Sequence, residues 1–531
     1  MRKSYKIILM VISILLIGSI IIGTSYSMWV KTAIQKEQNI VNSSCFDIEF
    51  TESSNINLTN AIPISDEAGL KKKPYTFTLK NTCNMNSKVT IALDVLSTST
   101  MSSSAIKTSL TKGNKSGTPT LLTSLDKKAD VDISGAKEAY ILGTDIIGAN
   151  KSKSYSLYLW MDESVTVAEA SKSFSSKVVI VNTATEEEPP IEILGKEITD
   201  TTQIATDDPD NNIRYIGKDP SNYVYFNCSD YSNQSDSSCE KWRIIGVFKN
   251  ITKADGTKED LVKIVRANSI GSFFFDYKKN GVGTSTNDDG SNDWTDSQLM
   301  MLLNPKDYLK SGYTIENNIV KDSNGQAIYQ NMGSYYNGTS GCKPAAVASG
   351  ADFTCTSIDF TSTGLKNDNT RNAIESVIWN LGSIEDYKTT VDNYYSAERS
   401  SVSYNNHATA WTGKIGLMYP SDYAYATAGS SSPNRDTCLK ASLTEISQFG
   451  SYRLCLENNY FYIYSYWFLL SSAKDTYSEI YTESQGVYPQ KSSGLFEAGY
   501  GTSPTLFLKS SVSISSGEGT SESPYQLSGI F

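Results

Sequence analysis

The chain has 531 residues, a formal charge of −10, 33 Tyr and a single His. At roughly 100 to 200 residues per domain, this length predicts two to four domains. The acidic excess argues against a nucleic-acid partner, because such binding depends on Lys and Arg that neutralise phosphates. A Tyr-rich chain of modest hydrophobicity favours β-structure, so we expect a mainly β fold.

Residues 1–27 are predicted to be a signal peptide or membrane anchor. Basic residues between Arg2 and Lys6 precede an unbroken apolar run, Ile7 to Gly23, and small residues follow up to Ser27. The run lies at the short edge of what spans a bilayer, so it is either cleaved after Ser27 or retained as an anchor. In both cases we expect a secreted or cell-surface protein that meets the membrane only through this segment.

Eight cysteines in an oxidising compartment predict disulfide bonds. Taken in sequence order, they form four local pairs, although the sequence alone leaves other connectivities open. Metal ligation is disfavoured, because there is no CxxC motif and the single His is far from any Cys. The predicted pairs are Cys45 with Cys83, Cys228 with Cys239, Cys342 with Cys355, and Cys438 with Cys455.

Residues 28–183 are predicted to form a β-sandwich. Apolar residues alternate with polar ones from Lys88 to Val95 and from Ser154 to Met161, as in strands with one buried face. Thr76 to Leu79 supplies a further strand, and Val178 to Val181 reads as a more completely buried one.

The same region carries GTSYSMW, then Cys45 to Ile48, Pro63 to Asp66 and Tyr75 to Thr82 in that order. In this order residues 1–183 resemble the TasA/camelysin group of secreted matrix proteins. The resemblance implies a β-sandwich and export. Metallopeptidase-like members of that group would imply zinc-binding residues, but this chain has no HExxH and no His before His407. We therefore carry over the fold and the export, and not proteolysis.

Residues 184–212 are predicted to be a linker. Three Glu and two Pro occupy 186–190, a composition typical of stiff, solvated connections, with an ordinary surface loop as the alternative. The end of this stretch carries Asp207, Asp208 and Asp210.

Residues 213–531 are predicted to form one larger, disulfide-stapled α+β module with long loops. Trp242 to Phe248 and Leu261 to Arg266 read as paired strands joined by a turn at Asp255-Gly256. One helix is predicted over 299–303 with Thr295 as its N-cap, and a second from Arg371 to Leu381, ended by Gly382. The remaining predicted buried strands are Gly416 to Tyr419, Tyr466 to Ser472 and Pro504 to Leu508.

This module contains, in order, WRIIGVF, NDWTDSQLMMLLN, GLMYPSDYAYA, YWFLLSS and SPTLFLKSSVSISSGEGTSESPY. Over residues 213–527 it resembles a module of secreted and surface proteins of Gram-positive bacteria. By pattern that module is similar to the C-type-lectin-like and sulfatase-modifying-factor-like folds, in which two helices brace a small sheet with long variable loops. The resemblance implies that the loops carry recognition. A formylglycine-type activity would imply a pair of active-site thiols, whereas the cysteines here are assigned to structure.

The sequence lacks the residues that most classes of enzyme need for catalysis. Nucleophilic triads and Cys-His pairs need a histidine, and His407 lies in an Asn-rich stretch that favours a solvated loop. The chain has no GxSxG, no GxxxxGK[ST] and no GxGxxG, so no nucleotide or other organic cofactor is predicted. Glycoside hydrolysis by two carboxylates stays open, since it needs only two acids brought together by folding.

Calcium is the one metal for which the sequence offers a candidate. Asp288, Asp289 and Asp293 lie in the densest cluster of oxygen ligands, but the acids are not spaced as in a DxDxDG loop. The pattern favours a polar loop over a Ca²⁺ site. Asp207, Asp208 and Asp210 form a second, weaker candidate.

Aromatic residues supply the candidate binding site. Tyr460, Tyr462, Tyr464 and Tyr466 alternate along the sequence, so a strand there would place four tyrosines on one face. Such rings bind sugars or protein surfaces, although a tyrosine-lined core layer is the favoured interpretation. We expect Trp242, Trp294, Trp379 and Trp411 to anchor the core.

These observations lead to a hypothesis of an exported bacterial cell-surface or matrix protein. Its C-terminal module would be a non-catalytic, adhesin-like binding module for an extracellular glycan or protein ligand. The alternatives are an extracellular carbohydrate-active enzyme that uses paired carboxylates, and a structural fibre subunit.

Overall fold

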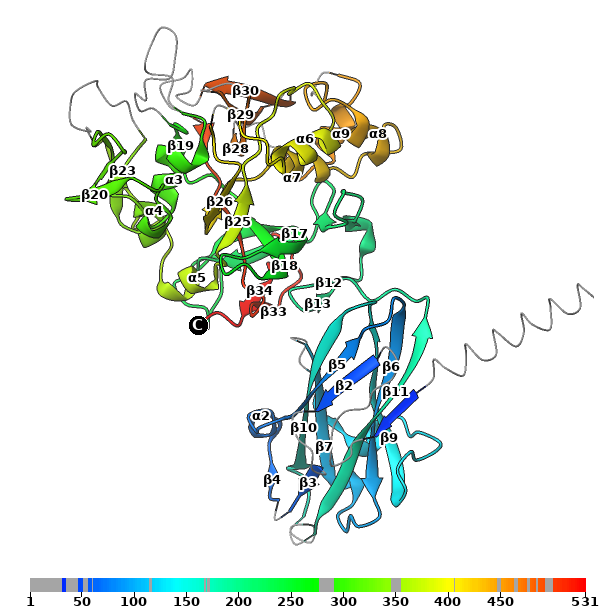
Figure 1. Cartoon of the computed structure of the whole chain (residues 1–531). Coiled ribbons are helices and arrows are strands. Elements are labelled where there is room, and N and C mark those ends of the chain that lie inside the picture. The colour runs from blue at the N-terminus through cyan, green and yellow to red at the C-terminus, as the bar shows by residue number, and fades with distance from the viewer. Residues whose placement is uncertain are drawn as a thin grey trace, which may run out of the picture. The chain divides into compact units, whose positions relative to one another are not determined.

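The computed structural model describes residues 31–34, 46–50, 56–59, 61–113, 117–166, 169, 172–276, 291–344, 355–404, 406–446, 450–462, 467–474, 478–483, 486–491 and 500–531. The predicted signal or anchor, Ile7 to Gly23, lies outside these residues. Of the helices within them, none combines the length and the apolar character that crossing a membrane requires. The chain divides into two compact units, Met1–Glu197 and Ile198–Phe531, which are described separately below (Figure 1).

The N-terminal unit is a β-sandwich of two sheets (Figure 1). One sheet has the order β1-β11-β6-β9 with β3 beside β11, and the other has the order β2-β5-β10-β7-β8 with β4 beside β10. The strands are β1 (Lys31–Ile34), β2 (Phe46–Phe50), β3 (Ile56–Leu58), β4 (Pro63–Ile64), β5 (Tyr75–Asn81), β6 (Asn86–Leu96), β7 (Ile106–Lys112), β8 (Thr120–Leu121), β9 (Ala136–Ile147), β10 (Ser152–Asp162) and β11 (Phe174–Thr185). Short helices α2 (Asp66–Leu70), η1 (Ser103–Ala105) and η2 (Leu122–Ser124) connect them.

The alternation seen in the sequence produces the core between the two sheets. Val89, Ile91, Leu93 and Val95 of β6 share one buried cluster with the alternating apolar residues of β10. Strand β11 is buried on both faces, because Val178 and Ile180 join that cluster while Val179 packs on the opposite side. The predicted sandwich strands are therefore confirmed.

The division between the units falls inside the predicted linker, 184–212. β11 continues to Thr185, and β12 (Glu192–Ile193) pairs with β13 (Lys196–Glu197). The second unit then begins with η4 (Thr201–Gln203) and β14 (Ile204–Ala205), so residues up to Asn212 belong to its fold. Residues 186–190, on whose composition the linker prediction rests, lie in no helix or strand and are mostly exposed, so the linker stays a prediction there.

The C-terminal unit is built on a seven-stranded sheet of order β14-β15-β17-β18-β32-β27, with β16 beside β17. The predicted strand pair is confirmed as β17 against β18, antiparallel, and Gly256 turns between them with φ of 81°. Its further strands are β15 (Ile213–Tyr215), β16 (Tyr223–Phe226), β17 (Glu240–Thr252), β18 (Lys258–Arg266), β27 (Ile415–Gly416) and β32 (Thr505–Phe507).

Smaller sheets and short helices surround this sheet (Figure 1). They comprise β19-β31-β28-β29-β30, β20-β21-β22, and the pairs β23-β24, β25-β26 and β33-β34. These strands are β19 (Ser272–Phe273), β20 (Thr314–Glu316), β21 (Ile319–Lys321), β22 (Ala327–Gln330), β23 (Ser340–Cys342), β24 (Ser357–Asp359), β25 (Val377–Asn380), β26 (Ala410–Gly413), β28 (Trp467–Ser472), β29 (Ser478–Glu483), β30 (Gly486–Lys491), β31 (Tyr500–Gly501), β33 (Ser513–Ser516) and β34 (Gln526–Ser528). The helices are η5 (Trp294–Asp296), α3 (Gln298–Leu303), η6 (Lys306–Tyr308), α4 (Ser334–Asn337), α5 (Asp368–Ala373), α6 (Val391–Glu398), α7 (Pro420–Tyr425), α8 (Arg435–Lys440) and α9 (Arg453–Glu457).

The two helix predictions fared differently. The helix over 299–303 forms as α3, but its N-cap is Ser297, whose hydroxyl accepts the Met300 N–H, while Thr295 lies within η5. The helix from Arg371 to Leu381 is wrong, because α5 ends at Ala373 and β25 follows.

Local patterning explains this error and a smaller one. In β25 the buried Val377 and Trp379 alternate with the exposed Ile378, a strand pattern that also satisfies helical spacing over so few residues. The strand predicted from Gly416 to Tyr419 is likewise shorter, because β27 stops at Gly416 and α7 begins at Pro420.

Three disulfides close local loops in the C-terminal unit. Cys228 bonds Cys239, Cys342 bonds Cys355, and Cys438 bonds Cys455, which is the sequential order predicted. Cys83 is also disulfide-bonded, and Cys45, its predicted partner, lies outside the described residues. These bonds indicate that the chain folds in an oxidising environment.

Candidate functional site

Five charged side chains are buried together in the C-terminal unit and are here called the charge network. They come from the segment that leads into β15, from β15 itself, from β18, and from the packed helices α6 and α7. Each is at most 3% exposed, although charged groups are rarely buried unless they are paired. The members are Asp208, Arg214, Lys263, Glu398 and Asp422.

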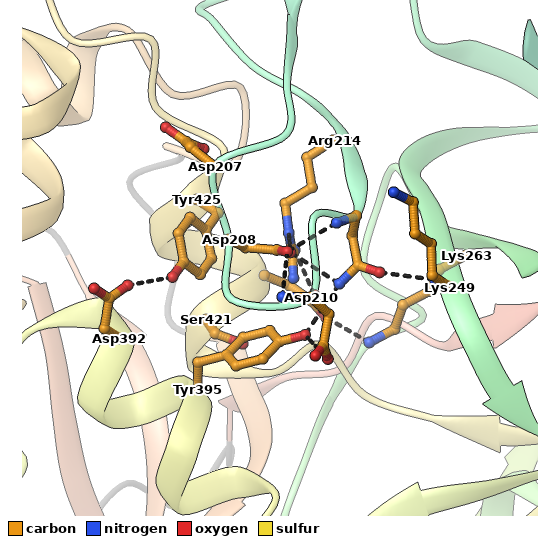
Figure 2. Close-up of polar contacts among 12 residues, drawn as sticks. Asp207, Asp208, Asp210, Arg214, Lys249, Lys263, Asp392, Tyr395, Ser421 and Tyr425 are labelled. Atoms are coloured by element: carbon orange, nitrogen blue, oxygen red, sulfur yellow. Dashed lines mark hydrogen bonds and ion pairs between the residues drawn. The ribbon is translucent and has the colours of Figure 1, made fainter. Parts of the chain in front are cut away.

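Arg214 lies at the centre of the charge network and bridges two carboxylates, of which that of Asp208 is labelled in Figure 2. Its Nε donates to Asp208 Oδ2 at 2.5 Å, and its Nη1 donates to Asp422 Oδ1 at 3.0 Å. Asp422 also accepts from Lys263 Nζ through Oδ2, at 2.5 Å. Asp422 therefore holds one cation on each oxygen, which explains how one carboxylate accommodates two buried cations.

Glu398 is satisfied separately by the start of α7. Its carboxylate accepts the Ser421 N–H at 2.9 Å and the Ser421 hydroxyl at 2.5 Å, and Arg399 Nη1 lies 3.0 Å away. With Arg399 included, three carboxylates face three cations, so the buried charges balance.

Burial and ion pairing shift the pKa values of these groups in opposite directions. Burial lowers the pKa of Lys263 to about 8, although the adjacent Asp422 carboxylate works in the opposite direction. For Asp422, the cations Lys263 and Arg214 outweigh burial and hold the pKa below its ordinary value. Burial raises the pKa of Glu398, despite the opposing charge of Arg399.

Asp207 and Asp210 extend the polar contacts outward from the charge network (Figure 2). Asp207 forms a two-point ion pair with Arg435, with both N···O distances 2.8 Å. Asp210 accepts the Tyr395 hydroxyl at 2.5 Å. The carboxylates of the weaker calcium candidate, Asp207, Asp208 and Asp210, thus hold arginine and tyrosine groups of their own chain, and calcium binding there stays a prediction.

Two pockets lie elsewhere in the C-terminal unit, and the charge network lines neither. The smaller, here called the aromatic pocket, has a volume of about 320 Å³. Arg243 lies in it with its guanidinium carbon 3.9 Å from the ring centre of Tyr223 and 4.8 Å from that of Tyr460. The lining residues are Tyr223, Lys241, Arg243, Val265, Arg266, Ala267, Asn268, Tyr460, Phe461, Trp467 and Ser521.

The cations of the aromatic pocket already have anionic partners. Arg266 makes a two-point ion pair with Glu240, and Lys241 pairs with Asp236. Arg243 pairs with Asp219 at 3.3 Å and donates to the side chains of Asn222 and Tyr223. The pocket therefore offers aromatic surface, with its positive charge largely neutralised.

The structure places the predicted tyrosine face only in part. Tyr460 lines the aromatic pocket but is 7% exposed and lies in a turn, where the Asn459 side chain accepts the Phe461 N–H. Tyr462 is half-buried and also outside any strand, while Tyr464 and Tyr466 lie outside the described residues. The strand expected here is not formed at its first two tyrosines, because Asn459 fixes a turn. Binding by these residues stays a prediction.

The larger pocket, here called the amide groove, has a volume of about 680 Å³. It is built by η6, the β20–β21 turn, α4 and the segment that enters β23. Asn318 and Asn331 adopt left-handed backbone conformations there, with φ of 63° and 57°, which asparagine tolerates better than most residues. The lining residues are Pro305, Lys306, Asp307, Tyr308, Ile315, Asn318, Asn331, Met332, Tyr336, Asn337, Thr339, Ser340 and Lys414.

Sequence reasoning missed the amide groove. Its lining comes from six short segments between Pro305 and Lys414, and no one segment carries a recognisable motif. The asparagines at 317–318 signal a turn, which is the one local feature that pointed to this region.

The remaining metal prediction is tested only at one residue. Asp293 caps η5 by accepting the Thr295 N–H at 3.0 Å, and its other oxygen lies 3.2 Å from Lys310 Nζ. Asp288 and Asp289 lie outside the described residues. In the part of the chain that the structure describes, no three His, Cys, Asp or Glu side chains are grouped to hold a metal ion.

Comparisons with known proteins add no family. No family model matches the chain, and no curated protein matches it. One solved structure, of the infectious bursal disease virus Gt strain, aligns with 30% of this chain at 8% identity and a TM-score of 0.14. The alignment spans 33% of that chain, and a TM-score this low carries no argument about fold or function.

Proposed function

We propose that this is an exported bacterial surface or matrix protein whose C-terminal unit is a non-catalytic glycan-binding module. The single observation that carries the proposal is the amide groove. Its volume of about 680 Å³ falls within the range of about 300–1,000 Å³ that is typical of ligand sites.

The polar groups of the groove suit sugar hydroxyls. The carboxamides of Asn318, Asn331 and Asn337 make no side-chain hydrogen bond among the described residues, so each offers both donors and an acceptor. Sugar hydroxyls are themselves donors and acceptors, which matches carboxamides better than it matches a cation. Tyr308 and Tyr336 add rings against which the apolar face of a sugar packs.

The groove favours binding over the carbohydrate-active alternative. Glycoside hydrolysis by two carboxylates needs a pair of Asp or Glu side chains on either side of the scissile bond. Asp307 is the one acid among the described residues that line the groove, and the aromatic pocket has none in its lining.

Two independent features support the proposed cellular location. The disulfides indicate an oxidising environment, and the first 27 residues carry an export pattern. The resemblance of residues 1–183 to secreted matrix proteins supports the same location.

A glycan array probed with the purified chain tests the proposal. We expect binding to neutral oligosaccharides that falls at least tenfold in Asn337→Ala and Tyr336→Ala. Asn324→Ala is the matched control, because Asn324 lies exposed in the β21–β22 turn outside the groove. Binding that survives both groove substitutions, or no binding to any glycan, would refute the proposed function.

A further inference from the structure

The contact between Lys263 and Asp422 places a nucleophile against a carboxyl group in a dry interior. Both side chains are 0% exposed, and Nζ lies 2.5 Å from Oδ2. The fold holds this amine and this carboxyl group in contact, so their effective concentration is high. Their reaction therefore avoids the entropy cost of bringing two separate molecules together. Water, which would reverse their condensation, is excluded from both groups.

We propose that Lys263 and Asp422 are a self-modification site, at which the folded chain joins Lys263 Nζ to Asp422 Cγ through an intramolecular amide bond. The substrate of this activity is the protein itself. The site lies apart from the amide groove and does not depend on the proposed function.

The reaction balances without any co-reactant. The Lys263 ammonium passes one proton to Asp422 Oδ2 along their hydrogen bond, and the free Nζ electron pair attacks Cγ. The electron pair of the C=O bond moves onto Oδ1, and a second proton passes from nitrogen to Oδ2. Re-formation of the C=O bond expels Oδ2 as water, so an ammonium and a carboxylate become one amide and one water, with no oxidation or reduction.

The surroundings favour the attack on Cγ, whereas the lowered pKa of Asp422 opposes the first proton transfer. Arg214 Nη1 donates to Oδ1 at 3.0 Å, the oxygen on which negative charge develops. Burial of Nζ, which is 0% exposed, favours the uncharged amine and lowers the pKa of Lys263. The rings of Tyr419, Trp379, Phe248 and Phe507, with centres 4.2 to 5.5 Å from Nζ, act in the opposite direction, because their faces attract the ammonium form.

The charge balance of the interior is preserved by the reaction. Condensation removes one positive and one negative charge, and Arg214 keeps Asp208 while Arg399 keeps Glu398. Each remaining charge of the network keeps a partner. The reaction also removes the free-energy cost of keeping the Lys263–Asp422 ion pair away from water.

Tryptic mapping of the full, reduced chain tests the proposal. A linked Lys263 resists trypsin, so residues 259–266 should appear joined to residues 415–435, with a total mass about 18 Da below that of the two peptides because one water is lost. Lys263→Arg, which keeps the cation but cannot form the amide, should be cut after residue 263 and release peptide 415–435 at full mass. Lys107, which lies 2.9 Å from Asp162 but is partly exposed, is the internal control and should remain unlinked.

Two results would overturn the proposal. One is cleavage after Lys263 with peptide 415–435 at its full mass in the wild-type chain. The other is a loss of about 18 Da confined to peptide 415–435 without a link, which indicates a cyclic imide at an aspartate.

Discussion

Arg214 is the residue whose replacement tests the charge network most directly. In Arg214→Met the side chain keeps much of its volume and its apolar contact with Phe248, but Asp208 and Asp422 lose their guanidinium partner. Removing one partner of a buried ion pair costs about 3–5 kcal/mol, since the remaining charge stays desolvated. We expect a loss of that size in the free energy of unfolding.

The expected shift of the melting temperature follows from the size of the unit. Unfolding entropy of about 2.1 cal/mol/K per residue, over the roughly 330 residues of Ile198–Phe531, gives about 1.5 °C per kcal/mol. Arg214→Met should therefore lower the melting temperature of this unit by about 4–7 °C in calorimetry.

The matched control is Arg453→Met. Arg453 pairs with Glu457 one turn along α9 and is 58% exposed, so its ion pair is screened by solvent. We expect a change within about 0.5 kcal/mol. If Arg214→Met is no more destabilising than Arg453→Met, the buried pairs do not stabilise the fold and the reasoning is refuted.

Three further predictions follow from other parts of the chain. Replacing Cys438 and Cys455 by Ser opens a loop closed over 17 residues and should cost about 3 kcal/mol in chemical denaturation, whereas an unchanged midpoint would show that the loop is fixed without its disulfide. Burial would raise the pKa of Asp207, but Arg435 lowers it, so the stability that this carboxylate contributes is present above pH of about 4 and is lost as pH falls through its folded pKa. The difference in unfolding free energy between wild type and Asp207→Asn should thus shrink from pH 7 to pH 3, and a difference that grows would contradict the ion pair. Tyr460→Phe removes a buried hydroxyl that has no hydrogen-bond partner among the residues that the structure describes, and it should leave stability unchanged or raise it by up to about 1 kcal/mol. A clear loss of stability in a thermal melt would contradict this expectation.

The sequence was sufficient to predict the export pattern, the mainly β character and the local disulfides. Each of these properties depends on residues that are close together in the sequence. The period-two alternation of 88–95 and 154–161 fixed which faces of β6 and β10 are buried. The helix from Arg371 to Leu381 failed because four apolar residues at helical spacing also fit a turn followed by a buried strand. Pairing of Val377–Asn380 with Ala410–Gly413 decided between them, and that partner lies about thirty residues away.

The candidate sites were far less accessible from the sequence. Tyr460 was singled out and does line a pocket, but the strand that was to display it is replaced at Tyr460 and Tyr462 by a turn held by Asn459. Asp207, Asp208 and Asp210 looked like oxygen ligands for a metal because the sequence shows the acids without their partners. Arg435, Arg214 and Tyr395, which occupy those carboxylates, are brought to them only by folding.

The sequence by itself determined an acidic, mainly β chain with an export pattern and the three local disulfides of the C-terminal unit, since composition and short-range spacing carry those properties. Tertiary structure alone decided that Lys263 meets Asp422 across 159 positions, and that asparagines from separate turns line one groove. Contacts of that kind arise from the closure of long loops around a shared core, and no local pattern in the chain records them.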